Sequence, residues 1–223
     1  MDIKKLLTAM GTDVIMLLLI GGFILYSSAS DMVVSFKPAI SFEDMLNGTE
    51  VKAGSHVEGD VIYVLDYFAS ESTYTQYNDG SRSADRASGN YYLIPTYDSF
   101  IGLKSRQVDV ADFNKLSDET FEYLTSGTEP TTKIFMQGSV KAMDDKVAKY
   151  YREYLEEMGY AEAEITAMGE PLVMEFVSFN AVRIMFIIGV VLIALALFFW
   201  RRRYQRELKG SGLKKAEDLP DTP

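Results

Sequence analysis

Few side chains in this sequence can do catalytic chemistry, and the only histidine, His56, is the first of them. A serine hydrolase would use it as the base, with Ser55, Ser70 or Ser72 as a nearby nucleophile. The sequence holds no G-x-S-x-G nucleophile elbow that would select one of these serines. Because the chain has no cysteine, a zinc site would have to be completed by carboxylates. The sequence therefore favours a structural role for His56 and assigns no catalytic residue, no metal ligand and no cofactor.

Two further motifs have simpler explanations than catalysis. Asp144 and Asp145 are adjacent, so their side chains point in different directions, and no D-x-D-x-D-G calcium loop accompanies them. They come directly before a helical pattern, where carboxylates interact favourably with the helix dipole. Residues 138–141 lack the first glycine and the spacing of a phosphate-binding loop. None of these residues is assigned to a site.

Tyrosines are the side chains best suited to binding, and the chain contains 14 of them. Five surround a polar loop and the hairpin expected after it: Tyr74, Tyr77, Tyr91, Tyr92 and Tyr97. Tyrosine offers a rigid apolar ring with a polar tip and is enriched in the energetic centres of protein interfaces. It is also common in β-strands for reasons of packing alone. The five tyrosines predict a partner-binding surface, with strand propensity as the alternative explanation.

The elements that would position this surface include a membrane anchor near the C-terminus. Residues 184–200 form 17 consecutive positions without charge or proline. Residues 181–183 extend this segment to about 20 residues, the length that crosses a bilayer. An aromatic belt followed by a basic cluster is typical of the cytoplasmic end of a span. We therefore expect a transmembrane helix over residues 181–200, with four residues as topology anchors: Trp200, Arg201, Arg202 and Arg203.

A second apolar run, residues 14–25, follows the lysine pair Lys4-Lys5. It fits a signal-anchor helix that tolerates Asp13 near the membrane interface. It also fits a cleaved signal peptide, because Ser27 and Ala29 are small residues at the spacing that precedes cleavage. We favour the anchor, since Asp13 separates the lysines from the apolar run.

Both interpretations of the N-terminal run give the same topology. The positive-inside rule keeps the basic cluster after residue 200 in the cytoplasm, so the residues between the spans lie outside. The chain then divides into an anchor over residues 1–29, an extracytoplasmic domain over 30–180 and a helix over 181–200. Residues 201–223 form a basic juxtamembrane segment and a disordered cytoplasmic tail. We expect a plasma-membrane protein with both termini in the cytoplasm and the lipid bilayer among its partners.

Charge also separates the middle of the chain from its end. Residues 30–178 hold 12 Lys and Arg against 26 Asp and Glu, a net charge of about −14. The residues from Arg201 onward hold seven basic and four acidic side chains. Phosphate binding needs a basic surface, so the acidic middle section excludes nucleic acid as its partner.

Apolar patterns between the two runs predict a domain of the α+β class, mainly antiparallel, for which a small barrel of the oligonucleotide-binding type is one form. Six extended segments are expected, over residues 55–70, 72–77, 91–97, 100–106, 132–140 and 171–177, with a polar loop over residues 78–90. One clear amphipathic helix is expected over residues 144–160. Two shorter helical pieces are expected at residues 110–116 and 117–127, with Ser117 capping the second and Gly127 ending it.

The two apolar runs and the segments HVEGDVIYVLDYFA and YYLIPTYDSFIGLK support a resemblance to a known family. The chain resembles a family of uncharacterised two-span membrane proteins from Gram-positive bacteria, classed as a domain of unknown function. The resemblance covers most of residues 1–205 and uses the patterns V-E-G-x-V and Y-Y-x-I-P. It implies no activity and no site residue.

The sequence therefore predicts a membrane-anchored, non-enzymatic interaction or scaffold protein, with another membrane or envelope protein as its partner. Two alternatives stay open. A hydrolase at the membrane surface would need a pocket with two converging polar groups. An accessory subunit of a transporter would contact its partner through the membrane helices.

Overall fold

The computed structural model describes the backbone of residues 10–217 and the side chains of residues 10–209. The chain forms two compact units. Unit 1 combines the two ends of the chain, residues 1–33 and 179–223, and unit 2 consists of residues 34–178. Lys4-Lys5 and residues 218–223 of the predicted tail lie outside the described residues.

Unit 1 contains the two apolar helices, α2 (Thr12–Val34) and α7 (Phe179–Glu217). By length and composition both can cross a membrane: α2 has 23 residues, and the part of α7 from Phe179 to Lys209, which contains the apolar run, has 31. A helix of 23 residues is about 34 Å long at 1.5 Å per residue, slightly more than the hydrocarbon core of a bilayer. Both runs that the sequence indicated are therefore helices of sufficient length.

Helix α7 does not end where the apolar residues end. It continues past Trp200 to Glu217. Extension of an existing helix requires no new nucleation, and each glycine in it costs only about 1 kcal/mol relative to alanine. Gly210 and Gly212 therefore do not end the helix.

The two helices of unit 1 contact each other at a pair of glycines. A Cβ atom on Gly21 would lie 3.1 Å from the carbonyl oxygen of Gly189, and a Cβ atom on Gly189 would lie 3.2 Å from that of Gly21. Small residues at a crossing let helix backbones approach closely, which strengthens packing where lipid removes any hydrophobic preference. Gly22, the next residue, would meet nothing within 4 Å. The contact is therefore specific to one face of α2.

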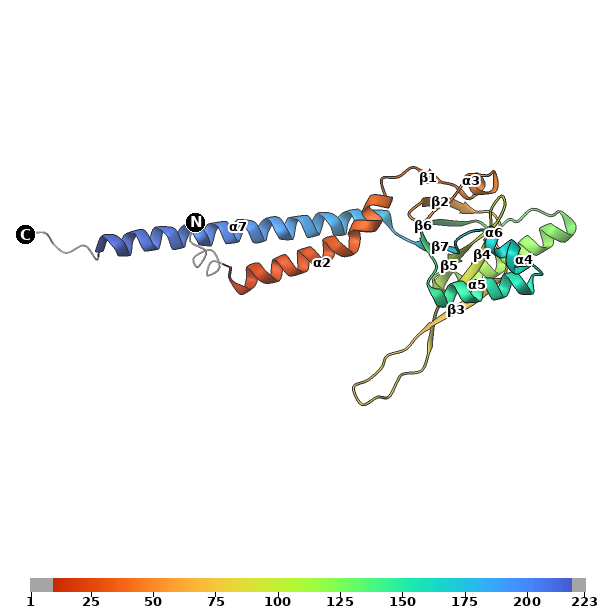
Figure 1. Ribbon diagram of the computed structural model, residues 1–223, viewed down its shortest axis with the longest axis horizontal. Helices are drawn as coiled ribbons and strands as arrows, with labels where there is room; N and C mark the ends of the chain where they lie inside the picture. Colours follow the sequence, from red (N-terminus) through yellow and green to blue (C-terminus); the bar gives the residue numbers. More distant parts are fainter. Residues whose placement is uncertain (1–9, 218–223) are drawn as a thin grey trace, which may run out of the picture. The chain divides into compact units, whose positions relative to one another are not determined.

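Unit 2 is built on a seven-stranded sheet with the order β1-β2-β6-β7-β5-β4-β3 (Figure 1). The pairs β1–β2 and β5–β7 are parallel, and the other four pairs are antiparallel. This confirms the α+β class and the mainly antiparallel pairing. The strands are β1 (Ala39–Ile40), β2 (His56–Val61), β3 (Tyr67–Thr73), β4 (Arg86–Pro95), β5 (Phe100–Lys104), β6 (Ile134–Ala142) and β7 (Leu172–Phe176).

The single strand predicted over residues 55–70 is wrong, because the chain leaves the sheet after Val61 and returns at Tyr67 on the opposite edge. The N–H of Leu65 donates to the carbonyl of Leu93 in β4, which is four strands from β2. Four strand spacings cover about 19 Å in a flat sheet, whereas four extended residues reach only about 14 Å. The sheet must therefore curl, but β2 and β3 do not pair, so it is not closed into the barrel that we considered.

The remaining strand predictions agree better with the structure. Strands β4 and β5 form the expected antiparallel hairpin, and Pro95 occupies the last position of β4, beyond the reach of β3. Strands β6 and β7 form where they were expected. The loop predicted over residues 78–90 is shorter, because β4 already begins at Arg86.

Three helices of unit 2 correspond to sequence signals of different clarity. Helix α5 (Asp145–Glu157) is the predicted amphipathic helix. Helix α4 (Val110–Ser126) is one continuous helix, so the predicted break at Ser117 is wrong; Ser117 is buried inside it. Gly127 ends α4 with a φ of 77°, as expected for a glycine cap. The short helices α3 (Phe42–Leu46) and α6 (Glu162–Ala167) were not predicted.

Both faces of the sheet carry an apolar core, because successive strand residues point to opposite sides. One core includes Tyr92 and Ile94 of β4 together with buried residues of α3 and α4. The other includes Tyr91 and Leu93 together with buried residues of α5 and α6. The middle of the sheet is therefore covered on both sides.

Glu119 of α4 ties that helix to the segment entering β6. Its carboxylate accepts hydrogen bonds from the backbone N–H groups of Thr131, at 2.7 Å, and Thr132, at 2.8 Å. The bond from Thr132 is the main reason that the pKa of Glu119 falls from 4.5 to about 2.

We expect this carboxylate to contribute stability that is present above pH 4.5 and is lost as the pH falls toward 2, because its folded pKa lies below its unfolded pKa. Glu119→Gln should lower the thermal unfolding midpoint of unit 2 at neutral pH. It should also make that midpoint fall less steeply as the pH is lowered from 4.5 toward 2. Circular dichroism of the full chain in detergent would measure both effects. The matched control is Glu122→Gln, at an exposed position of the same helix. Equal effects of the two variants would contradict the assignment.

The glycine contact in unit 1 gives a second prediction. Gly21→Leu should force α2 and α7 apart and destabilise their association by about 1–3 kcal/mol, the usual cost of overpacking. Gly22→Leu adds the same side chain one residue away, where the space is open, and should have little effect. Unfolding in detergent, followed by the fluorescence of the single tryptophan, Trp200, would compare the two. Similar midpoints for both variants would show that the helices do not meet at Gly21.

Candidate functional site

An ion pair joins the start of α2 to the far part of α7. The guanidinium of Arg203 donates from Nη1 to Oδ1 of Asp13 and from Nη2 to Oδ2, both at 2.7 Å. This is the two-pronged geometry in which arginine binds a carboxylate most strongly. Gly11 leaves the room that it needs, since a Cβ atom there would lie 1.9 Å from Nη1 of Arg203. The sequence reasoning missed this pair, although a lone carboxylate beside an apolar run was a signal for a buried or paired charge.

The four predicted topology anchors are therefore in two different situations. Arg203 is turned toward Asp13, and Arg203 and Trp200 are only partly exposed. Arg201 and Arg202 are fully on the surface. All four lie within the continuous helix α7. One side of this helix surface carries the paired Arg203, and another carries the exposed Arg201 and Arg202. The role of all four residues at a membrane interface stays a prediction.

The five tyrosines predicted as one surface are divided by the fold. Tyr91 and Tyr92 are 7% and 0% exposed, so the prediction is wrong for these two. They alternate on β4, each pointing into one of the two cores, and Tyr92 stacks on Phe113 with ring centroids 5.1 Å apart. Tyr97 is exposed at the opposite end of β4 from the arm described next, about 30 Å away by the length of a ten-residue strand. Strand propensity, the alternative explanation, accounts for the buried pair.

Tyr74 and Tyr77 lie in the arm, defined here as residues 74–85 between β3 and β4. Figure 1 shows this hairpin extending well beyond the sheet. Both tyrosines are about half exposed, at 52% and 54%. The arm is held by its own cross-strand bonds: Tyr77 N–H donates to the carbonyl of Ser81, and Ser83 N–H donates to that of Thr75, each at 2.9 Å. A defined and accessible surface results, without support from either core.

The side of Tyr74 toward the returning strand is covered by a cation. The guanidinium of Arg82 lies 5.1 Å from the centre of the Tyr74 ring, within the range of a cation–π interaction. Gln76 and Arg82 also form a β-bridge. Gly80, with a φ of 83°, allows the reversal at the tip. The arm therefore presents two aromatic rings and one arginine on a short two-stranded ribbon.

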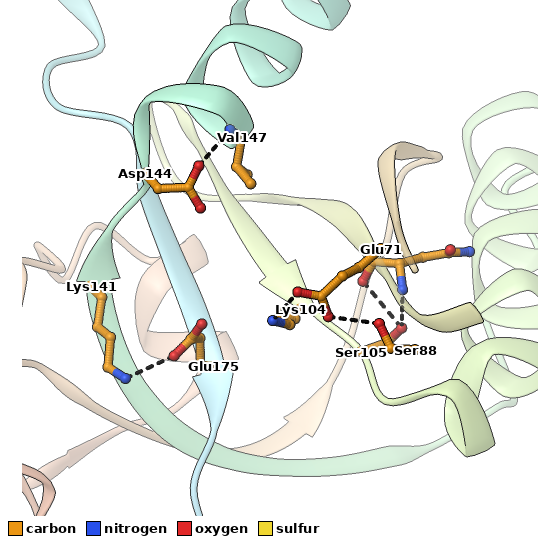
Figure 2. A network of polar contacts seen from close by, with 9 residues as sticks. Glu71, Ser88, Lys104, Ser105, Lys141, Asp144, Val147 and Glu175 are labelled. Carbon is orange, nitrogen blue, oxygen red and sulfur yellow. Dashed lines mark hydrogen bonds and ion pairs between the residues drawn. The ribbon is translucent and has the colours of Figure 1, made fainter. Parts of the chain in front are cut away.

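A row of alternating charges crosses the sheet of unit 2 (Figure 2). Glu71 of β3 bonds to Lys104 of β5 at 2.9 Å, and Glu175 of β7 bonds to Lys141 of β6 at 2.7 Å. Lys104 and Glu175 are direct partners in the parallel pairing of β5 with β7. Ser88 also donates to Glu71, at 2.9 Å. The Lys141–Glu175 pair joins the neighbouring strands β6 and β7, and the Glu71–Lys104 pair reaches across β4, which lies between β3 and β5. Opposite charges placed side by side in this way stabilise the sheet and its register.

The protonation states of this row do not fit hydrolase chemistry. Burial works to lower the pKa of Lys104, but its hydrogen bonds to Glu71 and Tyr91 outweigh burial and raise that pKa. The bond from Lys104 lowers the pKa of Glu71. A serine–lysine dyad needs a neutral lysine to take the proton of the serine. Lys104 stays charged and therefore cannot act as the base for the nearby Ser88 or Ser105.

His56 and Asp144 both have structural partners. Nδ1 and Nε2 of His56 each lie 3.1 Å from an acceptor, the carbonyl of Lys37 and the carboxylate of Glu58. Ser70 and Ser72 lie on β3, five strands from His56 in the sheet order. Asp144 caps α5 by accepting from two backbone N–H groups, as expected from the helix-dipole explanation. Figure 2 shows its bond to Val147.

A hollow of about 560 Å³ lies between the loop after α3, the β4–β5 turn and the end of α6. Its charged lining residues are Glu50, Lys52, Asp98 and Glu170. Lys52 and Glu50 pair at 3.0 Å, and both are mostly exposed. Among the lining residues, Ser99 shares hydrogen bonds with Thr96, and no histidine is present to act as its base. Within the described residues no group of three or more potential metal ligands occurs.

Comparison with known proteins places the chain in a family. No curated protein and no solved structure matches it. One family profile matches residues 3–201, a range that contains all of α2, the whole of unit 2 and the part of α7 from Phe179 to Arg201. Both apolar helices and the sheet domain therefore belong to one inherited arrangement. The chain is a member of the family described as "Domain of unknown function (DUF8577)".

Proposed function

We propose that this chain is a two-span membrane protein that displays unit 2 outside the cytoplasm as a non-enzymatic interaction module. The observation that carries the proposal is the arm, which exposes Tyr74 and Tyr77 on a ribbon that neither core stabilises. Side chains that are kept accessible at this structural cost are better explained by binding than by folding. The expected partner is another membrane or envelope protein.

The anchor in this proposal is a helical hairpin. The ion pair between Asp13, at the start of α2, and Arg203, late in α7, makes the two helices antiparallel. Unit 2 joins their other two ends through the chain. Since Arg201–Arg203 stay in the cytoplasm by the positive-inside rule, both termini are cytoplasmic and unit 2 is extracytoplasmic. The plasma membrane of a Gram-positive bacterium fits this topology and the absence of cysteine from the sequence.

Charge narrows the class of partner. Residues 30–178 carry a net charge of about −14, from 12 basic and 26 acidic side chains. Such a domain repels nucleic acid and anionic lipid, and it attracts a basic protein surface. The arginine and tyrosine side chains of the arm are of the types that most often dominate binding energy.

The chain's lack of cysteine gives a direct experiment. Tyr77→Cys places one thiol on the arm, and a membrane-impermeant maleimide carrying a photoreactive group will label it on intact native cells. After illumination, we expect one specific membrane or envelope protein to be attached. Phe121→Cys, at an exposed aromatic position on α4, is the matched control and should be labelled without capturing that protein.

Each alternative gives a different result in this experiment. Labelling of Tyr77→Cys only after lysis would contradict the topology. Labelling of intact cells without a specific attachment would contradict the role of the arm and direct attention to the hollow near Asp98. A photoreactive amino acid incorporated in place of Ile188, at an exposed position of the apolar run of α7, would need no labelling reagent, and attachment from it instead would favour an accessory subunit that binds through its membrane helices.

A further inference from the structure

Four cations lie on one side of α7 after its apolar part. Arg201, Arg202, Arg206 and Lys209 are all exposed. At 3.6 residues per turn they fall within an arc of about 140° around the helix axis. Glu207 falls outside this arc. A helix that continues past Trp200 therefore presents a cationic face, defined here by these four residues.

The fifth cation of this region, Arg203, is not counted in the cationic face because it is paired with Asp13. Both of its terminal nitrogens donate to Asp13, so its charge is already neutralised. Positive charge that only fixes topology could be spread around the helix. Here one arginine is used for the contact between the helices, and the other four cations have no carboxylate within 4 Å in the part of the chain whose side chains the structure describes. The cationic face is therefore available for an anionic ligand.

The position of the face along the helix identifies that ligand. Arg201 directly follows an aromatic belt, Phe198–Trp200, of the kind that lies at the level of lipid headgroups. At 1.5 Å per residue, Arg206 is about 7.5 Å and Lys209 about 12 Å further along the axis. Headgroup regions are about 5–8 Å thick on each side of the hydrocarbon core, and long basic side chains reach back toward them.

We propose that the cationic face binds the headgroups of anionic phospholipids in the inner leaflet. This inference rests on the membrane topology proposed above. Basic side chains close to an anionic surface favour binding by about fivefold for each charge, and four on one side act together. Bound anionic lipid would hold α7 at a fixed depth and rotation, with Asp13 and Arg203 on the other side of the helix.

The single tryptophan of the chain makes this proposal measurable, because Trp200 directly precedes Arg201 of the cationic face. All tryptophan fluorescence of the protein therefore comes from this position. Full-length protein in bilayers would be titrated with brominated phosphatidylglycerol or with brominated phosphatidylcholine, whose bromine atoms quench tryptophan on contact. We expect phosphatidylglycerol to be preferred. Arg202→Gln should reduce this preference by about fivefold. Arg152→Gln, which removes the same charge from an exposed position of α5, should leave it unchanged.

The other outcomes overturn the proposal in distinguishable ways. Equal quenching by the two lipids, or equal preference in Arg202→Gln and the unaltered protein, would exclude specific binding by the cationic face while leaving the anchor intact. Loss of the preference in sodium phosphate but not in sodium chloride of matched ionic strength would show binding of free phosphate instead. Quenching by neither lipid would show that Trp200 is not at a bilayer, and would also contradict the proposed topology.

Discussion

The ion pair between Asp13 and Arg203 is the interaction on which the organisation of unit 1 depends. These residues are 190 positions apart in the sequence, and their bidentate contact fixes both the direction and the relative level of α2 and α7. It explains how an apolar helix tolerates a carboxylate at its first turn, where the helix dipole is also favourable to negative charge. The glycine contact between Gly21 and Gly189 then sets how closely the helices approach.

Unit 2 depends on a different constraint: its residues are strongly acidic, yet both faces of its sheet are covered by apolar cores. Its apolar side chains alternate between two cores, and four charged side chains of the sheet form two opposite pairs, one between the neighbouring strands β6 and β7 and one across β4. Lys104 is the clearest case: burial alone would lower its pKa, and its partners raise it. Lys104 therefore pairs with Glu71 and does not serve as a base for a nearby serine. The arm is the part of unit 2 that these cores do not use.

Local patterns in the sequence were sufficient for the elements with strong, uninterrupted signals. The two apolar helices follow from uninterrupted apolar runs, and α5 follows from a clear helical period. The β4–β5 hairpin follows from two short apolar segments separated by Asp98-Ser99. The break between β2 and β3 could not be predicted, because residues 57–67 keep their alternation while the chain crosses to the opposite edge of a curled sheet. The continuity of α4 was missed because Ser117, a residue that often caps helices, is buried within it.

The candidate site was harder to predict than the fold. The five tyrosines are close in sequence, yet β4 carries two of them into the cores and separates Tyr97 from the arm by its whole length. The relation between Asp13 and Arg203 depends on two segments at opposite ends of the chain, which no local pattern connects. Only Tyr74 and Tyr77 of the predicted binding surface remain together in the arm. Among the predicted anchors, Arg203 has a partner, Asp13, that the sequence alone did not indicate.

The central claim is that Asp13 and Arg203 act as one unit that joins the two helices. A double-mutant cycle tests it most directly, with Asp13→Asn, Arg203→Gln and the double variant unfolded in detergent and followed by Trp200 fluorescence. The account predicts that each single variant is less stable than the unaltered protein and that the double variant is scarcely less stable than either single one, because the second substitution removes an interaction that is already lost. Additive losses in the double variant would show that the two residues act independently and would contradict the account.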